Sequence, residues 1–280
     1  MKTFELTPES VEEYEDFLSL DMAEHTGRQF HHELITLDDD DDPAAAILFR
    51  LEDVENEDGC WATIRRARFD DTEAAKEVFK EYTRQVSELG IKRSYFELPD
   101  AGLNREVFEE AGFSLKIGEG IVIRVTIEDF GRFKIFREKP DMEVVRIKEL
   151  GVREYRQGIE DCIAHSKRGV ASDVAYLPMG WFDKDISVAL KNDGKICGFF
   201  LLHLNPLGEL VPMMLCAVGD DIKMEVVNML RVSYKACVEK YSKDTVIKVI
   251  RHDDAVRMLT DRLFPEKKGR EVLIGERMEA

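Results

Sequence analysis

Hydrophobic positions in the second half of the chain alternate as in strands and then recur at helical spacing. After Gly219-Asp220-Asp221, apolar residues return at intervals of three and four, which predicts a long amphipathic helix. Asn192-Asp193-Gly194 separates two apolar runs, and Asp-Gly favours a tight hairpin turn. The predicted elements are strand Met142–Leu150, helix Val152–Ile163, strands Ile186–Lys191, Lys195–Leu204 and Glu209–Val218, the long helix, strand Thr245–Ile250, helix Asp254–Leu263 and strand Glu271–Ile274.

The first half of the chain predicts nearly the same order of elements. An acidic turn at Glu57-Asp58-Gly59 joins two of its strands, and Gly90 follows its longest helical pattern, where a glycine commonly ends a helix. The predicted elements are strand Thr3–Leu6, helix Val11–Met22, strands Ala44–Glu52 and Cys60–Phe69, helix Thr72–Leu89, strand Ile91–Leu98, helix Asn104–Ala111 and strand Leu115–Thr126.

This similarity of order is an internal repeat. Val11-Glu12-Glu13-Tyr14 corresponds to Val152-Arg153-Glu154-Tyr155, and Asp58-Gly59 to Asp193-Gly194. We therefore predict an α+β protein of two tandem domains, residues 1–130 and 141–280, each a mixed, mostly antiparallel sheet flanked by helices. The linker would be Glu128–Asp141, where Gly131 and Pro140 interrupt the periodicity. One large domain with a coincidental echo is the alternative.

Charge separates the two halves. The chain of 280 residues has a net charge of −17, and residues 1–140 hold 18 basic against 34 acidic side chains. This acidity argues against general binding to DNA, RNA or anionic membranes. The start of the chain lacks an apolar signal core, and the longest apolar stretch, Ile196–Leu204, is too short to cross a bilayer. Five cysteines without a C-x-x-C pair indicate reduced, buried thiols, so we expect a cytoplasmic protein.

Several common motifs do not occur in the sequence. Phosphate-binding, dinucleotide-binding and esterase signatures (G-x-x-x-x-G-K-[ST], G-x-G-x-x-G and G-x-S-x-G) are missing, so those chemistries lack support. His31-His32 precedes the acidic run Asp38–Asp42, but contiguous acids lack the alternation and glycine of a calcium loop. We predict a solvated acidic loop there and no metal site.

The order of elements, together with three short segments, resembles the GNAT superfamily of acyl-CoA-dependent acyltransferases, here as a tandem. "KNDGKICGFFLLHL" (Lys191–Leu204) is similar to the family's hairpin before its central strand. "DDAVRMLTDRLF" (Asp253–Phe264) and "NREVFEEAGF" (Asn104–Phe113) are similar to its N-x-x-A-x-x-x-Y-x-x-x-G-F segment. The resemblance covers most of both halves.

The resemblance implies a site for acetyl-CoA or another acyl-CoA. In the family, the central strand pairs with pantetheine, and the following glycine-rich loop offers amide groups at a helix N-terminus to the pyrophosphate. Carried over, the pantetheine strand is Ile64–Arg68 in the first half. In the second half, the cofactor-binding residues are Leu215, Cys216, Ala217, Val218, Gly219 and Lys223. The loops depart from the pattern, because aspartates stand where a helix N-cap belongs in both halves, and a plain capped helix is the alternative.

The resemblance also implies catalytic residues. The tyrosine that protonates the departing thiolate in the family is replaced by Leu259 in the second half and Phe108 in the first. A general base for the amine would be Glu209, at the start of the central strand, or His203, on the preceding strand. Trp181-Phe182 would border the acceptor entrance or form a packed lid.

Three functions remain open on this evidence. The leading one is transfer of an acetyl or other acyl group from acyl-CoA to the amine of a small molecule or peptide, in the second domain. The second is a catalytically inactive binding module, with the acidic first domain facing a basic partner. The third resembles the Fem-like aminoacyl transferases, although the net charge disfavours a tRNA partner.

Overall fold

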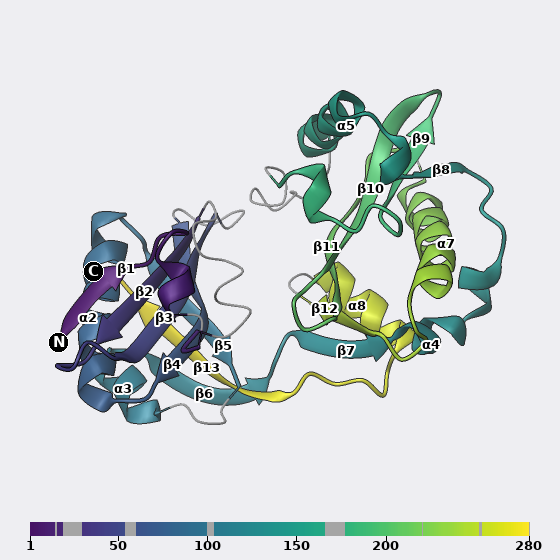
Figure 1. The fold of residues 1–280 in the computed structure, drawn as a ribbon. Helices are drawn as coiled ribbons and strands as arrows, with labels where there is room; N and C mark the ends of the chain where they lie inside the picture. Colours follow the sequence, from purple (N-terminus) through teal and green to yellow (C-terminus); the bar gives the residue numbers. More distant parts are fainter. Residues whose placement is uncertain are drawn as a thin grey trace. The chain divides into compact units, whose positions relative to one another are not determined.

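The computed structural model describes residues 1–14, 16–18, 30–53, 60–99, 104–165, 177–219, 221–251 and 254–279. They form two compact α+β units (Figure 1). The first unit is Met1–Gly120 with Lys268–Ala280, and the second is Ile121–Lys267. These bounds differ from the predicted domains 1–130 and 141–280, because Val122–Thr126, from the end of the first half, joins the second sheet, and Glu271–Met278, from the end of the second half, joins the first.

The first unit contains a seven-stranded sheet in the order β1-β2-β3-β4-β5-β13-β6. Helix α2 packs the apolar side of its length, from Ala74 to Val86, against one face of this sheet, together with α3. A smaller cluster around Leu6, Phe17 and Ile35 covers the other face. The elements are β1 Lys2–Glu5, a 3-10 turn Val11–Tyr14, β2 His31–Leu37, β3 Pro43–Asp53, β4 Cys60–Phe69, α2 Thr72–Glu88, β5 Arg93–Leu98, α3 Arg105–Glu110, β6 Ser114–Glu119 and β13 Glu271–Met278.

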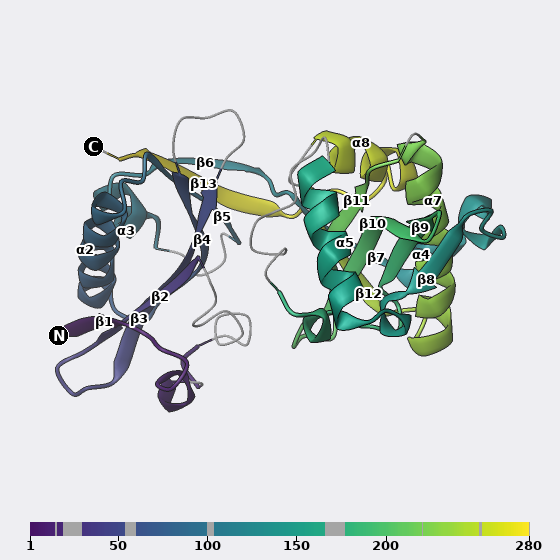
Figure 2. The same ribbon diagram turned by 90° about the horizontal axis from the view of Figure 1, so that it is seen from above.

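The second unit contains a six-stranded sheet in the order β7-β12-β11-β10-β9-β8. Helix α5 packs on one face, and α7 and α8 lie on the other (Figure 2). The elements are β7 Val122–Thr126, α4 Ile127–Gly131, 3-10 helices Lys134–Arg137, Ile147–Glu149 and Met179–Trp181 (η4), β8 Glu143–Arg146, α5 Val152–His165, β9 Val188–Asn192, β10 Lys195–Leu204, β11 Leu210–Ala217, α7 Ile222–Lys240, β12 Val246–Ile250 and α8 Asp254–Leu263.

The last predicted strand of each half pairs, in whole or in part, in the sheet of the other half. The single strand predicted over Leu115–Thr126 is divided: β6 pairs with β13, whereas β7 pairs with β12 in the second sheet. The last strand of the chain, β13, lies between β5 and β6 of the first sheet. The backbone just before β13 passes close to the backbone after β6. Gly269 permits this approach, because a Cβ there would overlap the carbonyl of Gly120.

In each sheet, one parallel strand pair diverges. β4 pairs with β5 from Trp61 to Ile64 and then continues to Phe69, and the described register of β11 with β12 is the single pair Leu210–Ile247. Each diverging strand also carries a bulge, at Arg65 in β4 and at Met213 in β11. A bulge adds one residue to a strand and bends it, so β4 and β11 turn away from their parallel neighbours.

The expected and observed elements differ most between Val11 and Leu37, where the sequence predicts a helix over Val11–Met22 and no strand. The structure has only a 3-10 turn at Val11–Tyr14, and most of the remaining positions to Met22 lie outside the described residues. β2, which follows, has no counterpart in the sequence prediction. Five consecutive residues of β2, from Glu33 to Leu37, are buried, because the strand is covered on both faces and so shows no alternation.

Candidate functional site

The residues expected to hold pantetheine lie on β11 and just after it, where this strand leaves β12. Leu215 is half-buried, and Ala217 is buried against the α7 side of the sheet. Cys216 faces the other way, into the cluster beneath α5, where its thiol lies beside that of Cys162. The Val218 amide donates to the Cys197 carbonyl (2.8 Å), which extends the pairing with β10 by one residue.

The amide groups at the start of α7 are bonded to the protein's own carboxylates. Asp221 accepts from the Met224 amide (3.1 Å) as the N-cap, and Glu225 accepts from the Gly219 amide (3.1 Å). Glu225 is only 6 % exposed, and a Cβ on Gly219 would overlap its carboxylate. Lys223 is exposed, and Asp220 lies outside the described residues.

These contacts decide how well a diphosphate fits. A helix N-terminus binds anions through unpaired N–H groups and its dipole, but Asp221 and Glu225 already supply the negative charge here. These two carboxylates would also repel a pyrophosphate bound at the start of α7. The residues at this end of α7 therefore do not fit the pyrophosphate of CoA.

His203 has one ring nitrogen fixed by a backbone contact. Its Nδ1 donates to the Trp181 carbonyl (2.9 Å), because a carbonyl oxygen can only accept. The imidazole also stacks on the Trp181 indole, with centroids 4.2 Å apart and planes within 10°. The neutral ring therefore carries its lone pair on Nε2. In register, His203 lies opposite Val211, next to the point where β11 leaves β12.

Glu209 is held in an ion pair. Its carboxylate accepts from Arg124 Nε (2.6 Å) on β7 and from the Asn205 amide (3.2 Å), and its side chain is 12 % exposed. Burial raises the pKa of Glu209, but the hydrogen bonds from Arg124 and Asn205 outweigh it and lower the pKa below its usual value. A carboxylate stabilised in its charged form is a weaker base than an unpaired one.

In the first unit, phenylalanines fill the space between the diverging strands. Phe108 on α3 is fully buried, and its ring centroid lies 4.4 Å from that of Phe96 on β5 and 5.6 Å from that of Phe69 at the end of β4. The loop amides are also used, because those of Asp70 and Asp71 both donate to the Ala44 carbonyl. These rings and these two amides are therefore already in contact with the protein's own groups.

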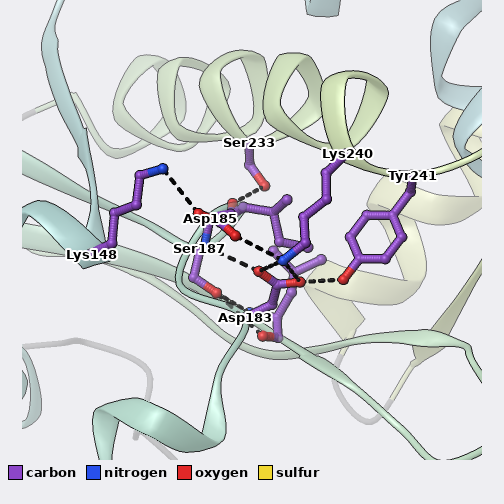
Figure 3. Close-up of polar contacts among 9 residues, drawn as sticks. Lys148, Asp183, Asp185, Ser187, Ser233, Lys240 and Tyr241 are labelled. Atoms are coloured by element: carbon purple, nitrogen blue, oxygen red, sulfur yellow. Dashed lines mark hydrogen bonds and ion pairs between the residues drawn. The ribbon is translucent and has the colours of Figure 1, made fainter.

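A polar network joins the end of α7 to the segment between η4 and β9, and sequence reasoning did not foresee it (Figure 3). The Asp183 carboxylate, 6 % exposed, accepts from Lys240 Nζ (2.8 and 2.9 Å) and from the Tyr241 hydroxyl. Lys240 also bonds Asp185 (2.9 Å). Burial together with the Asp183 hydrogen bond raises the pKa of Tyr241 to about 12. No sequence signal joins these groups, which lie more than fifty residues apart.

Three further expectations can be placed. Leu259, at the position of the family tyrosine, is partly exposed on α8, and neither it nor Phe108 can donate a proton. Among the described residues, no group of three His, Cys, Asp or Glu side chains could hold a metal ion. The described helices include none that is both long and apolar enough to cross a membrane.

Comparison with known proteins gives no match in sequence but several in structure. No family model and no curated protein matches the sequence. A tandem GNAT protein from the clavulanic acid biosynthesis pathway aligns with a TM-score of 0.60 and 8 % identity, over 100 % of this chain and 98 % of its own. The chain has a tandem GNAT fold. The predicted α+β class and tandem GNAT-like architecture are thus confirmed.

Two other solved structures share this fold. A probable N-acyltransferase from Enterococcus faecalis V583 has a TM-score of 0.56 and 10 % identity, over 99 % of this chain and 72 % of its own. A GCN5-related N-acetyltransferase from Anabaena variabilis ATCC 29413 has a TM-score of 0.53 and 14 % identity, over 100 % of this chain and 73 % of its own. At such identities the likeness carries the GNAT fold and leaves the reaction to be argued from the site.

Proposed function

We propose that the second GNAT unit transfers an acyl group to an amine, with His203 as the general base. This proposal is supported by the position of His203 on β10, opposite Val211 and next to the one described pair of β11 with β12, with Nδ1 committed to the Trp181 carbonyl. The amine nitrogen bonds to the acyl carbon as the bond from that carbon to its leaving group breaks. The proton released by the amine passes to Nε2 of His203, directly or through water.

The first unit takes no part in this chemistry. Its cleft is filled by Phe108, Phe96 and Phe69, and its loop amides are bonded to Ala44. Glu209 is the weaker candidate for the base, because its pairing with Arg124 favours the charged carboxylate. The amine acceptor is a small molecule or a peptide in this proposal, and its amine must reach His203.

The experiment is an acyl-transfer assay with a panel of amines and two thioester donors, acetyl-CoA and S-acetyl pantetheine, which lacks the diphosphate; products are followed by mass spectrometry. His203→Ala should lower kcat/KM by roughly 10²–10⁴-fold, the usual contribution of a general base. His165→Ala is the matched control, because His165 also contacts a backbone carbonyl through Nδ1 (2.8 Å) but lies exposed on α5. Equal turnover in the His203 variant and the wild type would refute the role of His203.

A second function is favoured by one specific observation. The carboxylates of Asp221 and Glu225 occupy the amide groups that would receive a diphosphate, as expected of a GNAT-fold module that binds a partner without catalysis. Thermal melting with CoA and with pantetheine, which lacks the diphosphate, separates the two functions, because a ligand at a hundred times its Kd stabilises a fold by about 2.7 kcal/mol. Absence of both a shift and any turnover would favour the binding module.

A further inference from the structure

Asp183 is connected to His203 through a short segment of backbone. Trp181 holds the His203 ring, and Asp183 follows two residues later. We propose that Asp183 is a positioning residue: its buried carboxylate, anchored by Lys240 and Tyr241, fixes the segment 181–187 so that Trp181 orients His203. The effect of Asp183 on catalysis rests on the proposed function. The structural coupling of Asp183 to His203 does not, and it can be tested without any substrate.

The first link is the anchoring of Asp183 to α7. Lys240 bonds both carboxylate oxygens, and the Tyr241 hydroxyl donates to the same group (Figure 3). The Asp183 side chain is 6 % exposed, and a buried carboxylate requires such partners to remain charged. Because Lys240 and Tyr241 lie at the very end of α7, they attach the segment to a rigid element.

The second link joins the same segment to β10. The Asp183 amide donates to the Leu202 carbonyl (2.9 Å), and the Ser187 hydroxyl accepts from the Leu202 amide (2.9 Å). Leu202 is the residue immediately before His203, so both of its backbone groups are held by the segment. Ser233 on α7 adds a third attachment, since its hydroxyl donates to the Ile186 carbonyl (2.7 Å).

The third link is the contact of Trp181 with His203. The Trp181 carbonyl accepts from Nδ1, and the indole covers one face of the imidazole. Both contacts depend on where the backbone at Trp181 lies, and that position is set by Phe182, which is buried, and by Asp183. Movement of this backbone would release Nδ1 and allow the other tautomer, with the proton on Nε2 and no lone pair there to accept a proton.

The chain offers a matched control in Asp185. Asp185 bonds the same Lys240 (2.9 Å) and also Lys148 (2.9 Å), but its side chain is 45 % exposed and it makes no described contact with Leu202. The Lys148 and Lys240 hydrogen bonds lower the pKa of Asp185 to about 2. Asp183→Asn and Asp185→Asn each remove one charge beside Lys240, but only the first changes the buried carboxylate that also accepts from the Tyr241 hydroxyl.

The test measures His203 and Trp181 directly. In a Trp61→Phe background, Trp181 is the only tryptophan, and its emission reports the stack. Nitrogen chemical shifts of the histidine rings, assigned with His203→Ala, report the tautomer. Asp183→Asn should redden the emission and move His203 away from a single Nδ1–H tautomer, whereas Asp185→Asn should leave both unchanged. Asp183→Glu should restore part of the wild-type signal.

The outcomes separate the two proposals. An unchanged tautomer and emission in folded Asp183→Asn would overturn the positioning role, as would equal changes in Asp185→Asn. In the acyl-transfer assay, Asp183→Asn should lower kcat by roughly 10²-fold with KM little changed, the loss expected from a misplaced catalytic group. Failure of the proposed function would be visible separately, as turnover that survives His203→Ala while the Asp183 variant still alters the tautomer.

Discussion

The exchanged strand β13 should stabilise the first unit through one buried ion pair. Arg277 bonds Glu279 through Nε (2.8 Å) and Nη2 (3.0 Å), and the two side chains are 9 % and 8 % exposed. Arg277 Nη1 also donates to the Ala111 carbonyl (2.8 Å), and its guanidinium lies over the Tyr82 ring at 5.3 Å. The pair thus joins the end of the chain to α2 and α3.

The magnitude follows from this burial. Arg277→Gln would leave the Glu279 carboxylate buried without its cation, and breaking a buried pair in this way costs about 3–5 kcal/mol. For a unit of this size each kcal/mol lowers Tm by about 3–5 °C, so a fall of roughly 9–25 °C is expected. Arg277→Met with Glu279→Leu should recover most of the loss, because neither charge is then left unpaired.

Urea unfolding of the full chain would measure this effect. Each unit contains one tryptophan, Trp61 on β4 and Trp181 in η4, so a Trp181→Phe background reports unfolding of the first unit. Arg84→Gln is the control, because the Arg84–Glu88 pair is 53 % and 62 % exposed and such pairs contribute only about 0–1 kcal/mol. If Arg277→Gln were no more destabilising than Arg84→Gln, the anchoring role of β13 would be refuted.

Three other outcomes are expected. Phe108→Ala should lower the free energy of unfolding of the first unit in urea by about 3–5 kcal/mol, because it leaves a cavity among packed rings. A loss below about 1 kcal/mol would mean that the neighbouring side chains fill this cavity. Glu225→Gln keeps an oxygen on the Gly219 amide but removes its charge, so millimolar CoA should raise Tm more in this variant than in the wild type, and equal shifts would contradict the repulsion. The pKa of Glu209 is lower in the folded than in the unfolded state, so its ion pair with Arg124 stabilises the fold above the unfolded pKa. This stabilisation is lost as the pH falls through the folded pKa. Glu209→Gln should therefore weaken the fall of Tm at acidic pH, as measured by melting over a range of pH.

Much of the local structure could be predicted from the sequence. β4, β10 and α8 begin and end at the predicted residues, because period-two and helical patterns depend on neighbours close in the chain. The hairpin at Asp193-Gly194 forms with both residues at positive φ (50° and 74°), as the Asp-Gly signal indicates. The tandem architecture also followed from the repeated order of elements.

The sequence by itself thus determined most of the elements, though not β2, together with their repeat and the place of His203 on β10 and of Glu209 just before β11. Only the tertiary structure decided which sheet β7 and β13 join, because the pairing of β13 with β6 depends on contacts between residues more than 150 positions apart rather than on local pattern. It likewise showed Glu225 bonded to the Gly219 amide and Asp183 to Lys240. Such partners are chosen by burial, since an enclosed charge or amide must find its partner wherever the fold brings one near.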